Sequence, residues 1–187
     1  MFGRARAKLE RLLASGHVNR NDVNLFYEGI FLKTVTSFEG LLEELFVGLL
    51  TGGITPVWDV RPRLTLLSYA VARDVVLGGK PYVDWLPYGH TEKRADAFFR
   101  AGRPFNKLSK PDKKFLERVL IIRHAVAHQS RSARKKFENE VIGGANLLPV
   151  ERTPGGFLRS VFRDAPPQTQ FEDIAATCAI LAHKLCT

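Results

Sequence analysis

The fold is decided by residues 21–49, which read NDVNLFYEGIFLKTVTSFEGLLEELFVGL. Apolar side chains recur along this stretch at intervals of three and four residues, which is the period of an α-helix with one buried face. They are Val23, Phe26, Ile30, Phe31, Val35, Phe38, Leu41, Leu42, Leu45, Phe46 and Leu49. We therefore predict a long amphipathic helix of about 28 residues, with Asn21 or Asp22 satisfying its first free backbone amides.

Glycine and proline divide the rest of the chain into shorter segments. Residues 51–63 hold Pro56, Trp58 and Pro62, so we expect an irregular connector there. Further helices are predicted over residues 63–77, 91–100 and 112–142, the last with or without a kink near 129–130. Without a predicted sheet to display them to bases, the following aromatic residues are expected to pack in the core: Trp85, Tyr88, Phe98, Phe99 and Phe105.

The region before the C-terminal helix has the pattern of two short strands. Segments 146–152 and 157–163 flank a Thr-Pro-Gly-Gly stretch at 153–156, and together they predict a small β-hairpin. After it, Thr169 and Glu172 can form a capping box that starts a last helix. The fold class that follows is an all-α helical bundle with a small β-hairpin insertion before the last helix. At this length we expect one domain over the whole chain.

The composition is that of an ordinary globular protein, with 45% hydrophobic and 25% charged residues. No apolar run approaches the roughly 18 residues that a membrane-spanning helix needs, and the first 16 or so residues form a basic amphipathic stretch rather than a signal peptide. We therefore expect a soluble cytoplasmic protein with no membrane partner. Cys178 and Cys186 lack partners at zinc-ligand spacing, which favours reduced structural thiols.

Positive charge is concentrated in one part of the chain. The net charge is +9, and residues 93–136 hold 14 lysines and arginines against three acids, whereas the remainder holds 14 against 16. A localised excess of this kind suits a polyanion, because each neutralised phosphate releases condensed counterions. Nucleic acid is therefore the leading partner class, and a merely solvated basic surface is the alternative.

The sequence RHAVAH, residues 123–128, lies within the helix predicted over 112–142. At about 100° per residue, Arg123 points from within an apolar stripe that includes Ile122 and Val126. A guanidinium in that position has to be paired, or has to line a cleft where a charged ligand arrives, because burying it alone is costly.

His124 and His128 lie about 40° from one another around the predicted helix. Imidazole, with an unperturbed pKa of about 6.5, suits proton transfer near neutral pH, and arginine is a permanent cation whose donors match phosphate oxygens. Together with the basic surface, these residue types indicate phosphoryl chemistry. The candidates for holding RNA phosphates follow the second histidine closely and are Arg131, Arg134, Lys135 and Lys136.

An Arg, a polar residue, three further residues and a His within a long helix resemble the motif of the HEPN family, of the RNA-cleaving toxin or defence type similar to RiboL-PSP-HEPN-like proteins. The resemblance is carried by residues 123–128, by Leu120-Ile121-Ile122 before them and by Gln129-Ser130 after them, and more loosely by Phe98-Phe99-Arg100 and the first long helix. The second motif position is commonly asparagine in this family and is His124 here, which leaves its role open. The resemblance implies a helical bundle that dimerises so that two motifs face a shared cleft.

The activity that the resemblance implies is that of a metal-independent endoribonuclease without a cofactor. His128 would be the general base that takes the proton from an RNA 2′-hydroxyl, and Arg123 would stabilise the charge on the phosphoryl oxygens. His124, or a histidine of the second chain, would protonate the departing 5′-oxygen. The products would be a 2′,3′-cyclic phosphate and a 5′-hydroxyl. A homodimer is implied, and a neutralising antitoxin-like partner is compatible with a toxin role.

Several alternatives stay open. Some family members lack cleavage activity, so a non-catalytic RNA-binding or protein-interaction module is the second hypothesis. Arg123 can instead serve the fold alone by pairing with the first long helix, where the candidate carboxylates are Glu39, Glu43 and Glu44. His124 and His128 can be boundary residues satisfied by hydrogen bonds. A zinc site from these histidines and Glu117 would make a metal-dependent hydrolase, but the carboxylate would have to reach across about two turns and a fourth ligand is missing.

Overall fold

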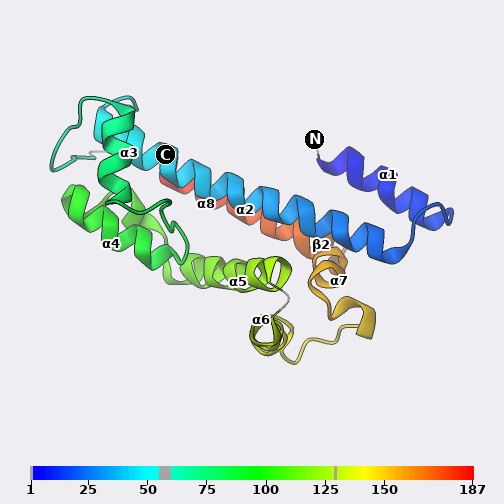
Figure 1. The fold of residues 1–187 in the computed structure, drawn as a ribbon. Helices are drawn as coiled ribbons and strands as arrows, with labels where there is room; N and C mark the ends of the chain where they lie inside the picture. The colour runs from blue at the N-terminus through cyan, green and yellow to red at the C-terminus, as the bar shows by residue number, and fades with distance from the viewer. Residues whose placement is uncertain (1, 55–59, 129) are drawn as a thin grey trace. The chain divides into compact units, whose positions relative to one another are not determined.

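The computed structural model describes residues 2–54, 60–128 and 130–187 (Figure 1). Its helices are α1 (Phe2–Ala14), α2 (Arg20–Thr51), α3 (Tyr69–Leu77), α4 (Tyr88–Phe98), α5 (Lys110–Ala127), α6 (Arg131–Phe137), α7 (Pro154–Arg159) and α8 (Gln170–Cys186). Strands β1 (Val161–Asp164) and β2 (Pro167–Thr169) form an antiparallel pair before α8. The predicted class, all-α with a small β-hairpin before the last helix, is confirmed. No helix of the described residues is both long and apolar enough to cross a membrane.

Contacts within the chain form two compact units, and each is described by itself. Unit 1 consists of residues 1–35 and 121–177, and unit 2 of residues 36–120 and 178–187. Helices α2, α5 and α8 contribute residues to both units. The single domain expected from the chain length stays a prediction.

The long helix predicted from residues 21–49 is confirmed as α2, which has 32 residues. The prediction that Asn21 or Asp22 satisfies its first free amides is wrong, because the acceptor lies two positions before Asn21: the Asn19 side-chain oxygen accepts from the backbone N–H of Asn21 at 2.8 Å and of Asp22 at 3.1 Å. The Asp22 carboxylate accepts in return from the Asn19 backbone N–H at 2.9 Å. Asn19 is therefore the capping residue, and Asp22 completes a reciprocal pair of the capping-box type.

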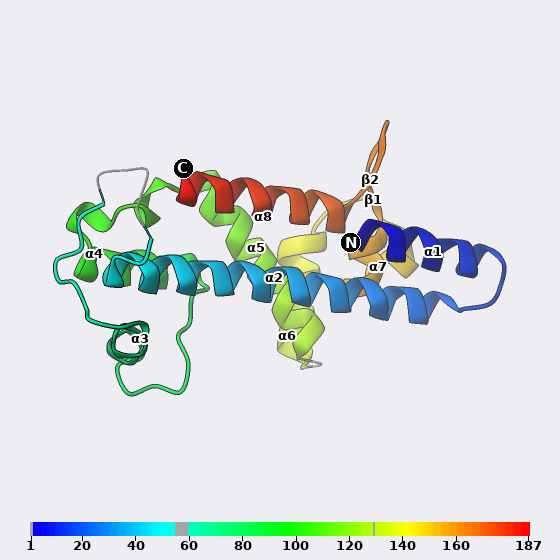
Figure 2. The same cartoon turned by 90° about the horizontal axis from the view of Figure 1, so that it is seen from above.

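In unit 1, α1 folds back beside the first part of α2 (Figures 1 and 2), where the Tyr27 hydroxyl donates to Glu10 at 3.1 Å. The α7 helix packs against the same part of α2 through Gly155. A Cβ built on Gly155 would lie 2.8 Å from the Cβ of Asn24, so only glycine permits this close approach. The contacts of α1 and α7 with α2 place the polar residues of unit 1 around the first part of α2.

The hairpin is correct in kind, but its predicted residues are wrong. Residues 149–151 form a single 3₁₀ turn, and the Thr-Pro-Gly-Gly stretch begins α7 instead of a β-turn. The Thr153 hydroxyl accepts from the Gly156 N–H at 3.1 Å, and Pro154 takes the first helical position, where a missing N–H costs nothing. The two strands pair later, around residues 165–166, with Val161 opposite Thr169.

Two other helix boundaries differ from the predictions. The helix predicted from residue 63 begins at Tyr69, because the Arg63 N–H donates to the Phe98 carbonyl at 2.8 Å and holds that segment extended. The helix predicted over residues 91–100 is α4, which begins and ends earlier. The capping box of α8 is confirmed, since Glu172 accepts from the Thr169 N–H at 2.8 Å and donates its own N–H to the Thr169 hydroxyl at 3.3 Å. Pro56 and Trp58 of the predicted connector lie outside the described residues.

The helix predicted over residues 112–142 is divided into α5, α6 and a π-helical turn over residues 138–142. α5 ends at Ala127, and the Ser130 hydroxyl accepts from the Ala133 N–H at 3.2 Å to start α6. Gly143 closes the turn with a φ of 49°. A kink was predicted near residues 129–130, and residue 129 lies outside the described residues. Serine competes for backbone amides in this way, which is why it starts helices more readily than it continues them.

Unit 2 has an aromatic core around Phe46, which is fully buried. Its ring centroid lies 4.9 Å from that of Phe99, and 5.0 to 5.7 Å from those of Phe105, Trp85 and Phe98. The Tyr88 hydroxyl is buried nearby and donates to the Phe105 carbonyl at 2.7 Å. The expectation that these aromatic residues pack in the core is confirmed for Trp85, Tyr88, Phe99 and Phe105, whereas Phe98 is half-buried at the edge of that core. Both cysteines are free, and burial raises the pKa of Cys178 to about 11.

Replacing Phe46 with Ala should lower the free energy of unfolding by roughly 3–5 kcal/mol, because the substitution leaves a cavity among four aromatic rings. Urea denaturation followed by circular dichroism measures the change. Phe162→Ala is the matched control, since Phe162 is 51% exposed and its loss should cost less than about 1 kcal/mol. Equal costs at the two positions would contradict the aromatic core.

Candidate functional site

The two motif histidines line a cavity of about 320 Å³ in unit 1, which we call the histidine hollow. Its lining residues are Ile121, His124, His128, Ser130, Ser132, Ala133 and Lys136. The break between α5 and α6 produces it, because the last turn of α5 supplies one wall and the first turns of α6 supply the other. Ser132 and Lys136 are four residues apart on α6 and therefore share the face that meets the histidines.

His124 and His128 lie side by side in this hollow, with ring centroids 5.9 Å apart and ring planes at 52°. Both side chains are exposed. The His128 N–H donates to the His124 carbonyl at 2.9 Å, so the helical geometry of α5 extends to the second histidine. The spacing of four residues thus places two imidazoles where both can reach one ligand.

The pKa of His124 is lowered. Partial burial is the largest cause, and the nearby charges of His128, Arg123 and Lys136 act in the same direction. Each of these effects disfavours the protonated ring. His124 is therefore a neutral imidazole at neutral pH, which is the form that accepts a proton.

Arg123 is half-buried in α5 and is not among the residues that line the histidine hollow. Its charge still acts on the neighbouring His124. Of the carboxylates considered as its partners, Glu43 accepts from Arg73 at 3.0 Å and Glu44 accepts from Tyr69 at 2.8 Å, both within unit 2. The cation that the structure brings into the hollow with the histidines is Lys136.

The four basic residues predicted to hold RNA are all exposed on α6. They do not share one face. Lys136 lines the histidine hollow, and Arg134 lines a separate cavity beside the start of α2. Arg131 and Lys135 project from the same short helix. Among the described residues there is no group of three His, Cys, Asp or Glu side chains placed to hold a metal ion.

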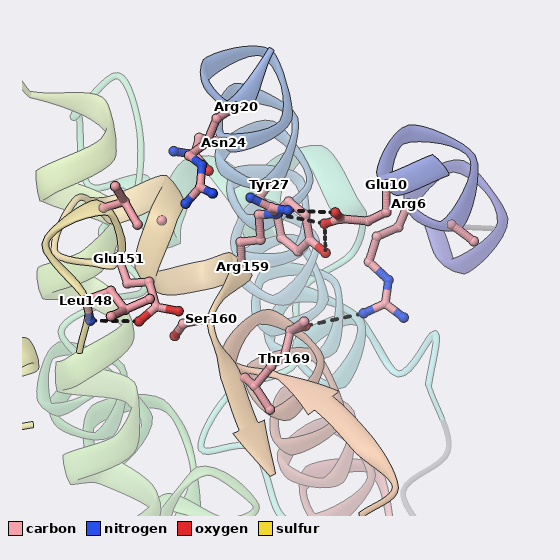
Figure 3. A pocket seen from close by; sticks show the side chains of 14 residues that line it. Arg6, Glu10, Arg20, Asn24, Tyr27, Leu148, Glu151, Arg159, Ser160 and Thr169 are labelled. Atoms are coloured by element: carbon pink, nitrogen blue, oxygen red, sulfur yellow. Dashed lines mark hydrogen bonds and ion pairs between the residues drawn. The ribbon is translucent and has the colours of Figure 1, made fainter. Parts of the chain in front are cut away.

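A second cavity of unit 1, of about 480 Å³, contains a network that the sequence did not reveal (Figure 3). The Arg159 guanidinium donates to both oxygens of Glu10, at 2.9 and 2.8 Å, and Tyr27 donates to the same carboxylate. Arg6 forms an ion pair with Glu172 and donates to Thr169 at 3.4 Å. Glu10 and Arg159 are 149 positions apart, and no local spacing rule could have paired them.

The charges of this network influence one another. The hydrogen bonds from Arg159 lower the pKa of Glu10 against the opposing effect of partial burial. Burial raises the pKa of Tyr27, and the Glu10 charge adds to that shift. Arg6 and Arg159 are both bound to carboxylates. The network in this cavity is therefore structural, and it connects α1 to α7 and α8.

No protein-family model, no curated protein and no solved structure gives a significant match to this chain. The function of this chain is therefore inferred from its residues and their geometry.

The low pKa of His124 can be tested by exchanging its neighbour. His128→Gln removes a nearby positive charge, so the pKa of His124 should rise, yet stay below the ordinary value of 6.5 because burial, the largest cause, remains. An NMR titration of the ring protons measures it. His17→Gln, at an exposed position on the loop before α2, is the control that should leave His124 unchanged. A wild-type His124 that titrates at or above 6.5 would contradict the described environment.

The Glu10–Arg159 pair predicts a pH dependence of stability. Because the folded pKa of Glu10 lies below its ordinary value of 4.5, the carboxylate stabilises the fold above that value and loses this contribution as the pH falls through the folded pKa. Glu10→Gln should therefore lower the free energy of unfolding at pH 7 and lose less of it between pH 5 and pH 2. Chemical denaturation over this range measures both, and Glu140→Gln, at an exposed position, should behave as wild type.

Proposed function

We propose that this chain is a metal-independent endoribonuclease of the HEPN type. The observation that carries the proposal is the histidine hollow, where two imidazoles 5.9 Å apart share one cavity with the Lys136 ammonium. The concentration of positive charge in residues 93–136 supports an RNA strand as the substrate. The match of residues 123–128 to the family motif supports the same class of activity.

The role of general base follows from the lowered pKa of His124. A neutral His124 is suited to take the proton from an RNA 2′-hydroxyl, after which the 2′-oxygen attacks the adjacent phosphorus. The bond from phosphorus to the 5′-oxygen breaks, and we assign to His128 the role of the acid that gives that oxygen its proton. This assignment reverses the roles that the family resemblance implies for the two histidines. The products are a 2′,3′-cyclic phosphate and a 5′-hydroxyl.

Lys136 and Arg123 supply the positive charge that the pentacoordinate phosphorus requires. Lys136 lines the hollow and is suited to contact a phosphoryl oxygen directly. Arg123 lies beside the hollow, where its charge acts on His124. We propose that two copies of the chain form a homodimer in a cytoplasmic toxin or defence system, with an antitoxin-like protein as the neutralising partner.

A second candidate function is that of an RNA-binding module without cleavage activity. The observation that favours it is the place of Arg123, which is half-buried and does not line the histidine hollow. Such a module would retain the basic α6 surface and would use the histidines only as hydrogen-bonding groups.

Cleavage of a labelled single-stranded RNA in excess chelator separates the two functions. The wild type should cut RNA and leave the DNA strand of the same sequence intact, because DNA lacks the 2′-hydroxyl. His124→Ala and His128→Ala should each reduce the rate by about 100-fold or more, as expected for loss of a general acid or base. His17→Ala controls for the loss of a surface imidazole.

Three other results of this cleavage assay would contradict the proposed nuclease or its mechanism. Salt-sensitive RNA binding without cutting by the wild type would move the assignment to the binding module. Cutting that the chelator abolishes would contradict the metal-independent mechanism. Cutting that survives in both motif variants would show that the activity belongs to other residues or to a contaminant.

A further inference from the structure

On the face of α6 away from the histidines, unit 1 contains another cavity, of about 670 Å³, which we call the α2–α6 hollow. Arg20 and Leu25 of α2 line it together with Arg134 of α6 and Val150. We propose that this hollow binds one nucleoside phosphate unit of the RNA strand whose scissile phosphate lies in the histidine hollow. Arg20 and Arg134 would hold the phosphate, and the apolar side chains would contact the base. The inference rests on the proposed function and names a second part of its substrate site.

The two arginines differ from the other arginines of this region. Arg159 and Arg6 form ion pairs with Glu10 and Glu172, and Figure 3 draws dashed lines from Arg159 to Glu10 and from Arg6 to Thr169. No such line leaves Arg20, and neither the Arg20 nor the Arg134 side chain has a hydrogen bond or ion pair within the described part of the chain. Two guanidiniums without carboxylate partners at one cavity are suited to a phosphate, whose oxygens match their planar donors.

The rest of the hollow suits the uncharged part of a nucleotide. Leu25 is 64% exposed and Val150 is 43% exposed, so both present apolar surface to solvent beside the arginines. A flat base would cover that surface. The one carboxylate of the lining, Glu28, has a raised pKa because of its burial, and the Gly155 N–H acts against this shift.

The geometry of α6 relates the two hollows. Arg134 lies about 160° around the helix from Ser132 and Lys136, so the two cavities lie on opposite faces of one short helix. The width of a helix with its side chains is about 10–12 Å, a distance that a strand of a few nucleotides covers. A strand that passes over α6 would place one phosphate at Lys136 and another at Arg134.

Binding of a non-cleavable strand tests the proposal directly. The probe is a fluorescent RNA hexamer with 2′-O-methyl groups, and its affinity is measured by anisotropy at several salt concentrations. Arg20→Gln and Arg134→Gln should each weaken binding about tenfold, and each should reduce the slope of log affinity against log salt by about 1. The double variant should lose less than the product of the single losses, because both guanidiniums hold the same phosphate. Arg4→Gln, an exposed charge loss on α1, should change the affinity less than twofold.

Adenosine 5′-monophosphate and adenosine identify the bound part. The monophosphate should bind the wild type and lose affinity in Arg20→Gln and Arg134→Gln, whereas adenosine should bind at least tenfold more weakly. Arg20→Lys and Arg134→Lys keep the charge and should recover part of the affinity, and thermal melting confirms that every variant is folded. Equal affinity for adenosine and its monophosphate, or equal losses in Arg4→Gln and Arg20→Gln, would overturn the proposal. Equal affinity for the monophosphate and the hexamer would assign the hollow to a free nucleotide and overturn the strand assignment.

The outcome is separable from that of the proposed function. A wild type that binds the hexamer through Arg20 and Arg134 but cuts no RNA would remove the nuclease activity and keep the nucleotide site. If the wild type cuts RNA and both arginine variants cut it with the same KM as the wild type, the nuclease activity would stand and the nucleotide site would be ruled out.

Discussion

The hydroxyl of Ser130 accepts a hydrogen bond from the Ala133 amide, and the arrangement of both hollows depends on this one contact. Ending α5 at Ala127 and starting a new helix after it lets α6 present Ser132 and Lys136 to the histidines. In an unbroken helix, Ser132 and Lys136 would lie further from the histidines along the helix axis, by about 1.5 Å per residue. The break therefore lets one short basic helix, α6, contribute a basic residue to each of two separate cavities.

Electrostatics then lowers the pKa of one of the motif histidines, His124. The cations near His124 add to its partial burial, and all of them favour the neutral ring. Proton-transfer chemistry needs one group that accepts a proton and one that gives it, so a lowered pKa at one member of a pair divides the roles. The same basic surface that attracts a polyanion also prepares one histidine as the acceptor.

Much of the fold could be predicted from the sequence, because α2 and α8 are specified by local periodicity and by capping residues within three positions. The packing of aromatic residues around Phe46 was predictable for a different reason, since no predicted sheet displayed those rings for stacking on bases. The hairpin was misplaced because Thr153 and Pro154 satisfy the rules for a turn as well as those for a helix start. The Glu10–Arg159 pair and the α2–α6 hollow each join segments that are far apart in the sequence. Only the tertiary structure brings those segments together, so neither feature could be predicted.

The place of Arg123 gives a physical reason for the dimer of the proposed nuclease. A spacing of five residues puts Arg123 about 140° from His128 around the α5 axis, whereas His124 and His128 are about 40° apart. One copy therefore cannot direct all three side chains into its own hollow, and Lys136 takes the position of the local cation. A second copy that meets the first along α5 would bring its own Arg123 to the phosphate from the other side. In the proposed dimer, the motif would be complete only across two chains, and each hollow alone would hold the two histidines and one cation.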